Sequence, residues 1–293
     1  MVLVKSIRIV VVREMINSVS DYMNLVNSSA DYIRTVLANS EIPSICIVLG
    51  SGLSPLASMC EDVISIPYGD IPGFPVSTVP GHEGRMLIGT LEGKKVFMMS
   101  GRFHYYEGYD TSICTLYVRV MAKLGVKTLV LTNAAGGILE DMEPADLMSI
   151  SDHISFFCES PLRGANLDEF GVRFPDQSCI YDREYLQTLD DCAEELGITL
   201  HTGIYIYSKG PQYESPAEIQ VFKSMGVGAV GMSTVPEAIV ASHCGIRVAA
   251  VSCITNLAAG ISPNPLTHEE VMVNASKASE NSCNLVKAFI RKI

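Results

Sequence analysis

Arginine, histidine and serine side chains follow apolar runs of this sequence, in positions from which they can bind an anion. Arg102 and His104 come directly after the apolar run Lys95–Met99 and are two residues apart. In an extended loop both side chains would face the same side. A guanidinium and an imidazole are donors that suit a phosphate group. Ser51, between two glycines, and Ser233, at a predicted helix start, add hydroxyl donors.

A second set of residues comprises an aromatic side chain and polar groups at or after the ends of other predicted strands. Tyr106 offers a flat apolar wall for a sugar, and Glu107 could hold the neighbouring imidazole in its donating tautomer. Glu214 stands just before another predicted helix, and an apolar strand ends in Thr255 and Asn256. Such groups follow several predicted strands, and together they are harder to dismiss than any one of them.

Each of these signals also has a plain structural explanation. The Gly-Ser-Gly segment around Ser51 is neither a Walker loop nor a full dinucleotide motif, and a tight turn would explain it equally well. His82 lies in a Gly- and Pro-rich loop, where a local hydrogen bond explains it better than binding does. Glu214 suits the dipole of the helix that follows, and Ser233 could be a capping hydroxyl. Ala134 could leave room for a ligand or pack a strand against a helix.

The elements that must position these residues alternate between strands and helices. Short apolar runs predict the strands Ile45–Leu49, Lys95–Met99, Thr128–Leu131, Leu147–Ile150, Gly203–Tyr207, Ala229–Gly231 and Val248–Ile254. Periodicity and capping patterns predict helices over Thr111–Leu124 and Arg183–Leu196, and further helix starts at Ser215, Thr234 and Thr267. This alternation predicts one α/β domain with a largely parallel sheet flanked by helices. Such sheets bind ligands at the carboxyl ends of their strands.

The composition excludes several classes of protein. The chain has 293 residues and a net charge of −11 without a block of Lys and Arg, so nucleic acids and anionic membranes are poor partners. No apolar run approaches the ~18 residues of a membrane helix. The run Ile9–Val12 is shorter than the ~7–15 residues of a signal-peptide core. Nine scattered cysteines without a CxxC pair indicate reduced thiols, a cytoplasmic location and no zinc site.

Seven short strings of the sequence carry a family resemblance. LGSGL, VPGH, GRFHYYEGY, TNAAGG, PLRG, VGMSTVPE and CITN occur in this order. With them the chain resembles the trimeric, low-molecular-mass purine nucleoside phosphorylases of the nucleoside phosphorylase superfamily. The resemblance implies one phosphorylase domain over residues 19–293, with a mixed sheet flanked by helices and with active sites at the contacts of a homotrimer. Residues 1–18 would form an N-terminal extension of unknown role.

The resemblance also implies roles for individual residues. The implied phosphate site consists of Ser51, His82, Arg102, His104, Ala134 and Ser233. The implied nucleoside site consists of Tyr106, Tyr213, Glu214, Met232, Thr255, Asn256 and His268, with Phe174 from the neighbouring subunit. Among these, Asn256, Glu214 and His104 would be the catalytic residues. The sequence departs from the family where Tyr213 replaces the Phe of many relatives, and in its spacing from Asn256 to His268.

The activity implied by the resemblance is reversible phosphorolysis of inosine, guanosine and their deoxy forms to the free base and (deoxy)ribose 1-phosphate, in purine salvage. Inorganic phosphate would be the co-substrate, and no metal or organic cofactor is expected. The nearest alternative is a methylthioadenosine phosphorylase, which should have Asp in place of Asn256 and a small polar residue in place of Glu214. A nucleoside hydrolase and a non-catalytic nucleoside-binding protein are further alternatives, and phosphate-dependent base release separates them.

Overall fold

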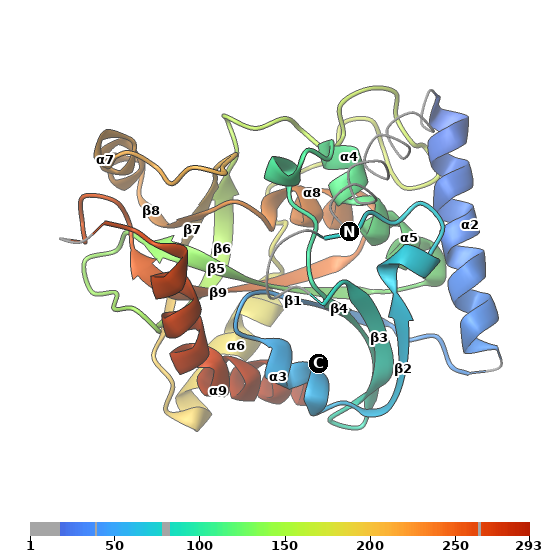
Figure 1. Ribbon diagram of the computed structural model, residues 1–293, viewed down its shortest axis with the longest axis horizontal. Helices are drawn as coiled ribbons and strands as arrows, with labels where there is room; N and C mark the ends of the chain where they lie inside the picture. Colours follow the sequence, from blue (N-terminus) through green and yellow to red (C-terminus); the bar gives the residue numbers. More distant parts are fainter. Residues whose placement is uncertain (1–17, 39, 78–82, 263–264) are drawn as a thin grey trace.

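The computed structural model describes residues 18–38, 40–77, 83–262 and 265–293, and its strands form one mixed sheet (Figure 1). The strands are β1 Ile45–Leu49, β2 Glu61–Pro67, β3 Arg85–Leu91, β4 Lys94–Ser100, β5 Thr128–Gly137, β6 Leu147–Ile154, β7 Leu200–Tyr207, β8 Val227–Gly231 and β9 Arg247–Leu257. Their order along the sheet is β2-β3-β4-β1-β5-β8-β7-β6-β9. β1 pairs in parallel with β4 and β5, and β3 pairs in antiparallel with β2 and β4.

One half of the sheet closes on itself. β5 pairs in parallel with β9 along its length, and in antiparallel with β8 through Gly136 and Gly137 at its end. The pairing continues from β8 through β7 and β6 to β9, so these strands form a small closed ring. β5 belongs both to the ring and to the open half of the sheet. The carboxyl ends of β1, β4, β5 and β9 therefore lie together.

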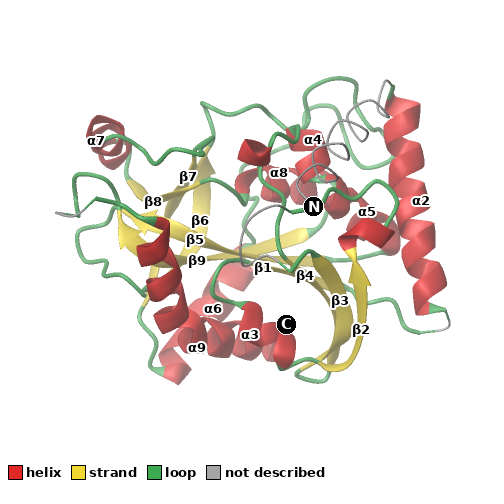
Figure 2. Ribbon diagram, viewed as in Figure 1, coloured by secondary structure: helices red, strands yellow, loops and turns green. Residues whose placement is uncertain are grey.

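Helices cover both faces of this sheet (Figure 2). They are α2 Val19–Leu37, α3 Ser54–Ser58, α4 Thr111–Cys114, α5 Leu116–Leu124, α6 Arg183–Leu196, α7 Pro216–Ser224, α8 Val235–His243 and α9 His268–Lys292. One hydrophobic core contains Ile33 of α2, Val120 of α5 and Val240 of α8. A second core contains Leu189 of α6 and Phe289 of α9. The two cores pack on opposite faces and fix the strand ends between them.

All strands predicted from apolar runs are present, and most extend further than the runs. The helix predicted over Thr111–Leu124 is interrupted at Thr115, whose hydroxyl donates to the carbonyl oxygen of Thr111 at 2.8 Å. Such side-chain bonds to the preceding turn distort helices. The predicted α6 is confirmed, as are the helix starts at Ser215, Thr234 and Thr267. Neither β2 nor β3 was predicted. The exposed residues of β2 break any apolar run, and in β3 the apolar run Met86–Ile88 ends at Gly89 after three residues.

Two further features concern the helices and the cysteines. Within the described ranges, none of the helices has the length and apolar character of a membrane span. All nine cysteines are free thiols.

Candidate active site

One cavity lies at the carboxyl ends of the strands, where the segments that follow β1, β4, β7 and β8 meet the ends of β5 and β9. The predicted site residues that line it are Ser51, Arg102, His104, Tyr106, Ala134, Tyr213, Glu214, Met232, Ser233, Thr255, Asn256 and His268. The fold thus brings side chains from most of the length of the chain into one space. This is the position that the strand pattern predicts for a ligand site.

Two glycines fix the loop that presents Ser51, for two different reasons. The backbone N–H of Gly50 donates to Thr132 Oγ1 at 2.8 Å, and a Cβ at Gly50 would lie 2.6 Å from the Thr132 carbonyl oxygen. Gly52 has a φ of +86°, and its Cβ would lie 2.6 Å from the carbonyl oxygen of Ala275 on α9. Only glycine fits either position. The turn is therefore required by packing, and it also places Ser51 at the cavity.

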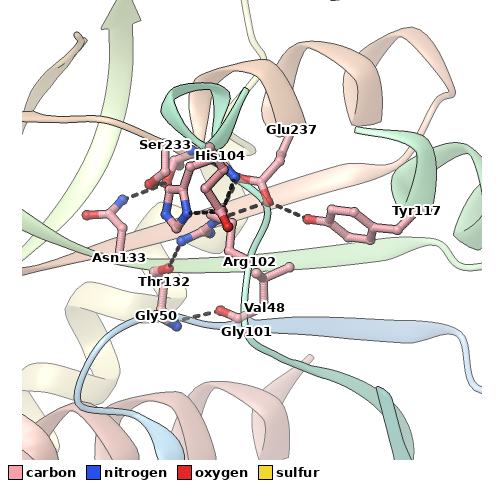
Figure 3. Close-up of polar contacts among 12 residues, drawn as sticks. Val48, Gly50, Gly101, Arg102, His104, Tyr117, Thr132, Asn133, Ser233 and Glu237 are labelled. Carbon is pink, nitrogen blue, oxygen red and sulfur yellow. Dashed lines mark hydrogen bonds and ion pairs between the residues drawn. The ribbon is translucent and has the colours of Figure 1, made fainter. Parts of the chain in front are cut away.

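Arg102 is a buried cation held by a buried carboxylate (Figure 3). Its Nε donates to the two carboxylate oxygens of Glu237 at 2.9 and 3.0 Å, and its Nη1 donates to the Thr132 carbonyl oxygen at 2.8 Å. Burial lowers the pKa of Arg102, but Glu237 and Tyr117 raise it by more. The guanidinium therefore keeps its charge, which burial alone would disfavour.

A strained turn presents Ser233. Thr234 has φ +74° and ψ −51°, and the N–H of Val235 donates across it to the carbonyl oxygen of Ser233 at 2.8 Å. This is a γ-turn with a positive central φ, which is costly for a β-branched residue. Asn133 Nδ2 donates to Thr234 Oγ1 at 2.8 Å, and Glu237 accepts from the Thr234 N–H at 2.9 Å. These two contacts hold the turn, and the turn leads from the cavity into α8.

His104 stacks on Tyr106, with ring centroids 4.7 Å apart and planes 16° from parallel. Glu107 Oε1 lies 3.1 Å from His104 Nδ1 and accepts from the His104 backbone N–H at 2.9 Å. The prediction that Glu107 holds a donating tautomer needs correction. A neutral ring that donates from Nδ1 to Glu107 presents Nε2 as an acceptor, and Nε2 donates only when the ring is protonated.

A β-bulge aims Asn256 at the cavity. Ala135 of β5 pairs with Ile254 of β9 and Gly136 pairs with Asn256, so Thr255 is an extra residue in β9. Thr255 Oγ1 donates to Asn256 Oδ1 at 3.1 Å, and Asn256 Nδ2 donates to the carbonyl oxygen of the next residue at 3.2 Å. The Asn256 side chain is thus buried and held at both ends of its amide.

Glu214 and Tyr213 line the cavity from the segment that follows β7. Burial raises the pKa of Glu214, and a hydrogen bond from Ser208 offsets only part of that rise. The segment passes close to Met232. A Cβ added at Gly210 would lie 2.3 Å from the Met232 sulfur, which shows how near the backbone comes. A glycine at this position lets the backbone approach the sulfur.

The remaining three predicted site residues are exposed or lie outside the described residues. His268 lines the cavity from the start of α9 but is exposed. Phe174 does not line this cavity; its side chain is 87% exposed, beside a separate hollow that Tyr207 and Pro236 also line. Its predicted contact is with a neighbouring subunit, so a single chain does not test it. His82 lies outside the described residues.

Comparison with known proteins identifies the family. The family model of the phosphorylase superfamily matches residues 44–291. The chain is 49% identical over 268 residues to purine nucleoside phosphorylase 1 of Geobacillus stearothermophilus, covering 92% of this chain and 97% of the relative. The chain belongs to the purine nucleoside phosphorylase family.

Solved structures of this family share the fold of the chain. The purine nucleoside phosphorylase of Schistosoma mansoni in complex with inosine superposes with a TM-score of 0.87 at 40% identity, covering 92% of this chain and 96% of that one. Isoform 2 from the same organism, in complex with cytosine and ribose-1-phosphate, gives a TM-score of 0.87 at 41% identity, with the same coverage. The mixed α/β sheet that the resemblance implied is confirmed.

Several residues in or beside the cavity of this family member were not predicted. Glu237 was recognised only as a helix cap, because a TVPE pattern does not reveal that the glutamate is buried against an arginine. Asn133 and Val271 line the cavity without a distinct sequence signal. Among the described residues, no group of three or more His, Cys, Asp and Glu side chains is placed to hold a metal ion.

Proposed function

We propose that this chain catalyses the reversible phosphorolysis of 6-oxopurine nucleosides to the free base and (deoxy)ribose 1-phosphate, as a step of purine salvage. The observation that carries the proposal is the composition of one cavity. Arg102 and Ser233 supply donors for phosphate and His104 supplies a ring nitrogen, while Glu214 and Asn256 supply paired polar groups for a base. Two family members support it, one crystallised with inosine and one with ribose-1-phosphate.

The phosphate is the nucleophile in the proposed reaction. Ser51, Arg102, Ser233 and the backbone around Ala134 would hold it beneath C1′, where it attacks as the bond to N9 breaks. This reaction passes through an oxocarbenium-like state. Because no carboxylate nucleophile is needed, most of the catalysis is positioning. Neutral His104 would accept a hydrogen bond from a P–OH group at Nε2, since Glu107 faces its Nδ1.

Asn256 and Glu214 would recognise the base and activate it as a leaving group. The Asn256 amide can donate to O6 and accept from N7–H as the leaving purine gains charge and a proton, and a preorganised dipole of this kind stabilises the transition state. An ionised Glu214 would accept from N1–H, which adenine lacks. Tyr106 and Met232 would contact the ribose, with His268 at its far end.

Inorganic phosphate is proposed as the co-substrate, without a metal or organic cofactor. Methylthioadenosine phosphorolysis is the second candidate within the fold, but Asn256 and Glu214 pair with a 6-oxopurine better than with a 6-aminopurine. Hydrolysis is not favoured, because a hydrolase has no need for the donors gathered around Arg102.

A panel of nucleosides incubated with and without phosphate tests the proposal. Release of hypoxanthine from inosine and of guanine from guanosine should depend on phosphate, and adenosine and methylthioadenosine should react at least ~10²-fold more slowly. Base release that is equally fast without phosphate would indicate a hydrolase. Preferential cleavage of methylthioadenosine would favour the second candidate.

We propose further that the active species is a cytoplasmic homotrimer in which Phe174 reaches the ribose of the neighbouring subunit. The family resemblance and the 87% exposure of this aromatic side chain support the assembly. The nine free thiols suit a reducing compartment. Sedimentation should give a trimer of the 31.7-kDa chain, and a fully active monomer would overturn the proposal.

A further inference from the structure

A buried carboxylate beside the proposed phosphate site connects three separate elements. Glu237, 3% exposed, accepts from Arg102 Nε, from the Tyr117 hydroxyl at 2.6 Å and from the backbone N–H of Thr234 at 2.9 Å. Arg102 follows β4, Tyr117 belongs to α5 and Thr234 follows β8. Figure 3 shows the carboxylate between the Tyr117 ring on one side and the Arg102 guanidinium on the other.

Helix capping accounts for only part of this arrangement. The bond from Thr234 N–H to Glu237 is the capping-box bond of α8. The same motif caps α7, where Glu218 accepts from the N–H and hydroxyl of Ser215. Glu218 is exposed, whereas Glu237 is buried against a guanidinium. A helix cap does not require a buried carboxylate, so the burial of Glu237 needs another explanation.

The contacts of Glu237 fix two donors of the proposed phosphate site. Both of its oxygens accept from Arg102 Nε, which sets the direction of the guanidinium. Its bond to Thr234 helps hold the strained γ-turn that presents Ser233. Because Arg102 and Glu237 together carry no net charge, phosphate binding here depends on aligned hydrogen bonds more than on net charge.

We propose that Glu237 is a positioning residue that holds Arg102 and Ser233 in the geometry that binds phosphate, and that the Tyr117 hydroxyl in turn fixes the Glu237 carboxylate. This inference rests on the proposed function and extends it to residues that do not line the cavity. Glu237 does not contact the reacting atoms. Its effect reaches phosphate through the direction of the guanidinium and the shape of the turn.

The Tyr117→Phe variant tests the proposal without changing any charge. It keeps the aromatic ring and removes one donor to Glu237. Tyr22→Phe is the matched control, because Tyr22 is also a buried tyrosine and its hydroxyl donates to the Ser112 carbonyl oxygen at 3.0 Å, outside the cavity. The measurements are kcat, KM for phosphate and for inosine, and the rise in Tm that inorganic phosphate causes.

Tyr117→Phe should raise KM for phosphate about three- to tenfold, leave KM for inosine within twofold, and reduce the phosphate-induced rise in Tm. Tyr22→Phe should lower Tm without changing KM for phosphate. Glu237→Gln should raise KM for phosphate further, because the neutral amide removes the charge opposite Arg102 and turns one acceptor oxygen into a donor. Oε1 accepts from Tyr117 and Oε2 from Thr234, so one of these two bonds is lost in either orientation of the amide. If Glu237→Gln does not fold, the KM for phosphate of Tyr117→Phe alone tests the proposal.

An unchanged KM for phosphate in Tyr117→Phe would overturn the proposal. So would equal rises in both KM values, or the same result in Tyr22→Phe, because these indicate general loosening of the fold. If the unmutated protein releases no base, the proposed function fails. The phosphate-induced rise in Tm still measures the effect of Tyr117 and Glu237 on phosphate binding in that case.

Discussion

At the scale of single residues, contacts within the protein orient the Arg102 side chain without a ligand. Its Nε faces a carboxylate and its Nη1 faces a backbone carbonyl oxygen, so most rotamers are excluded. A free arginine side chain would lose about 2 kcal/mol of rotamer entropy on being ordered. Here that ordering takes place during folding, so a phosphate at the proposed site would meet donors that are already aligned.

Replacing Arg102 should therefore weaken phosphate binding selectively. Arg102→Ala should raise KM for phosphate by ~10²-fold while KM for inosine changes only a few-fold, as measured by steady-state kinetics with each substrate varied. The change also leaves Glu237 buried and unpaired, at a cost of ~3–5 kcal/mol in stability. Arg102→Lys keeps the charge without the planar fork and is the companion variant. Equal effects on both KM values would remove Arg102 from the phosphate site.

In the proposed function, Asn256 selects the preferred purine. Asn256→Asp replaces a group that donates and accepts with a carboxylate that only accepts. The activity toward inosine, as kcat/KM, should fall ~10²–10³-fold, and the ratio of adenosine to inosine cleavage should rise. Parallel assays with the two nucleosides measure this ratio. A variant whose ratio equals that of the unmutated protein would show that Asn256 does not read the 6-position.

The sequence predicts the residues that line the cavity when they follow strands. It does not predict the buried residues that hold them in place. Ser51, Arg102 and Asn256 were found because the ends of parallel strands converge, whatever the details of packing. Glu237 was identified as a helix cap and no more. Its burial depends on β4, α5 and α8 meeting in space, which no local pattern contains.

At the scale of elements, irregular backbone segments orient two of the residues that line the cavity. The bulge at Thr255 turns Asn256 inward, and the γ-turn at Thr234 presents Ser233. Neither was predicted, because strand and helix periodicities describe regular structure and a bulge is one residue out of register. The regular elements that carry these irregularities, including β9 and α8, were predicted from apolar runs and capping signals.

Gly50 lets two elements approach closely, and a side chain there should disturb both. The Cβ of Gly50→Ala would lie 2.6 Å from the Thr132 carbonyl oxygen, which is backbone and cannot rotate away. Overpacking of this kind costs ~1–3 kcal/mol. We expect a lower Tm and a higher KM for phosphate, because Ser51 moves with the loop. Gly197→Ala is the control, since Gly197 ends α6 with open space around it and a φ of +65°, so an alanine there causes backbone strain without a clash; a raised KM for phosphate in that variant would point to a general effect.

At the scale of the whole molecule, a buried histidine links stability to pH. His243 on α8 accepts at Nδ1 from Arg119 Nη1 at 3.4 Å and donates from Nε2 to the Val172 carbonyl oxygen at 3.1 Å. Burial and the Arg119 charge lower the pKa of His243 below 6.5. Below about pH 6.5 the unfolded chain therefore binds a proton that the folded chain excludes, and stability falls as pH decreases.

Thermal unfolding at pH 5.5 to 8 should measure this dependence. Tm should be nearly constant above pH 7 and should fall below about pH 6.5, with a contribution from His243 of at most about 1.4 kcal/mol per pH unit. His243→Gln removes the titrating group and should flatten the acid side of the profile. An identical slope in the variant would assign the dependence to other groups, of which His153 is one, because burial also lowers its pKa.

The closed ring of strands has a consequence for aggregation. Because β9 returns to pair with β5, the described sheet has one open edge, which is β2. That edge is poorly suited to recruiting a strand from another molecule. Asp62 has a φ of +51°, and the register with β3 shifts between Glu61 and Ile64. A kinked edge that begins with two carboxylates repels a second copy of this acidic chain, so intermolecular β-addition is blocked where it could begin.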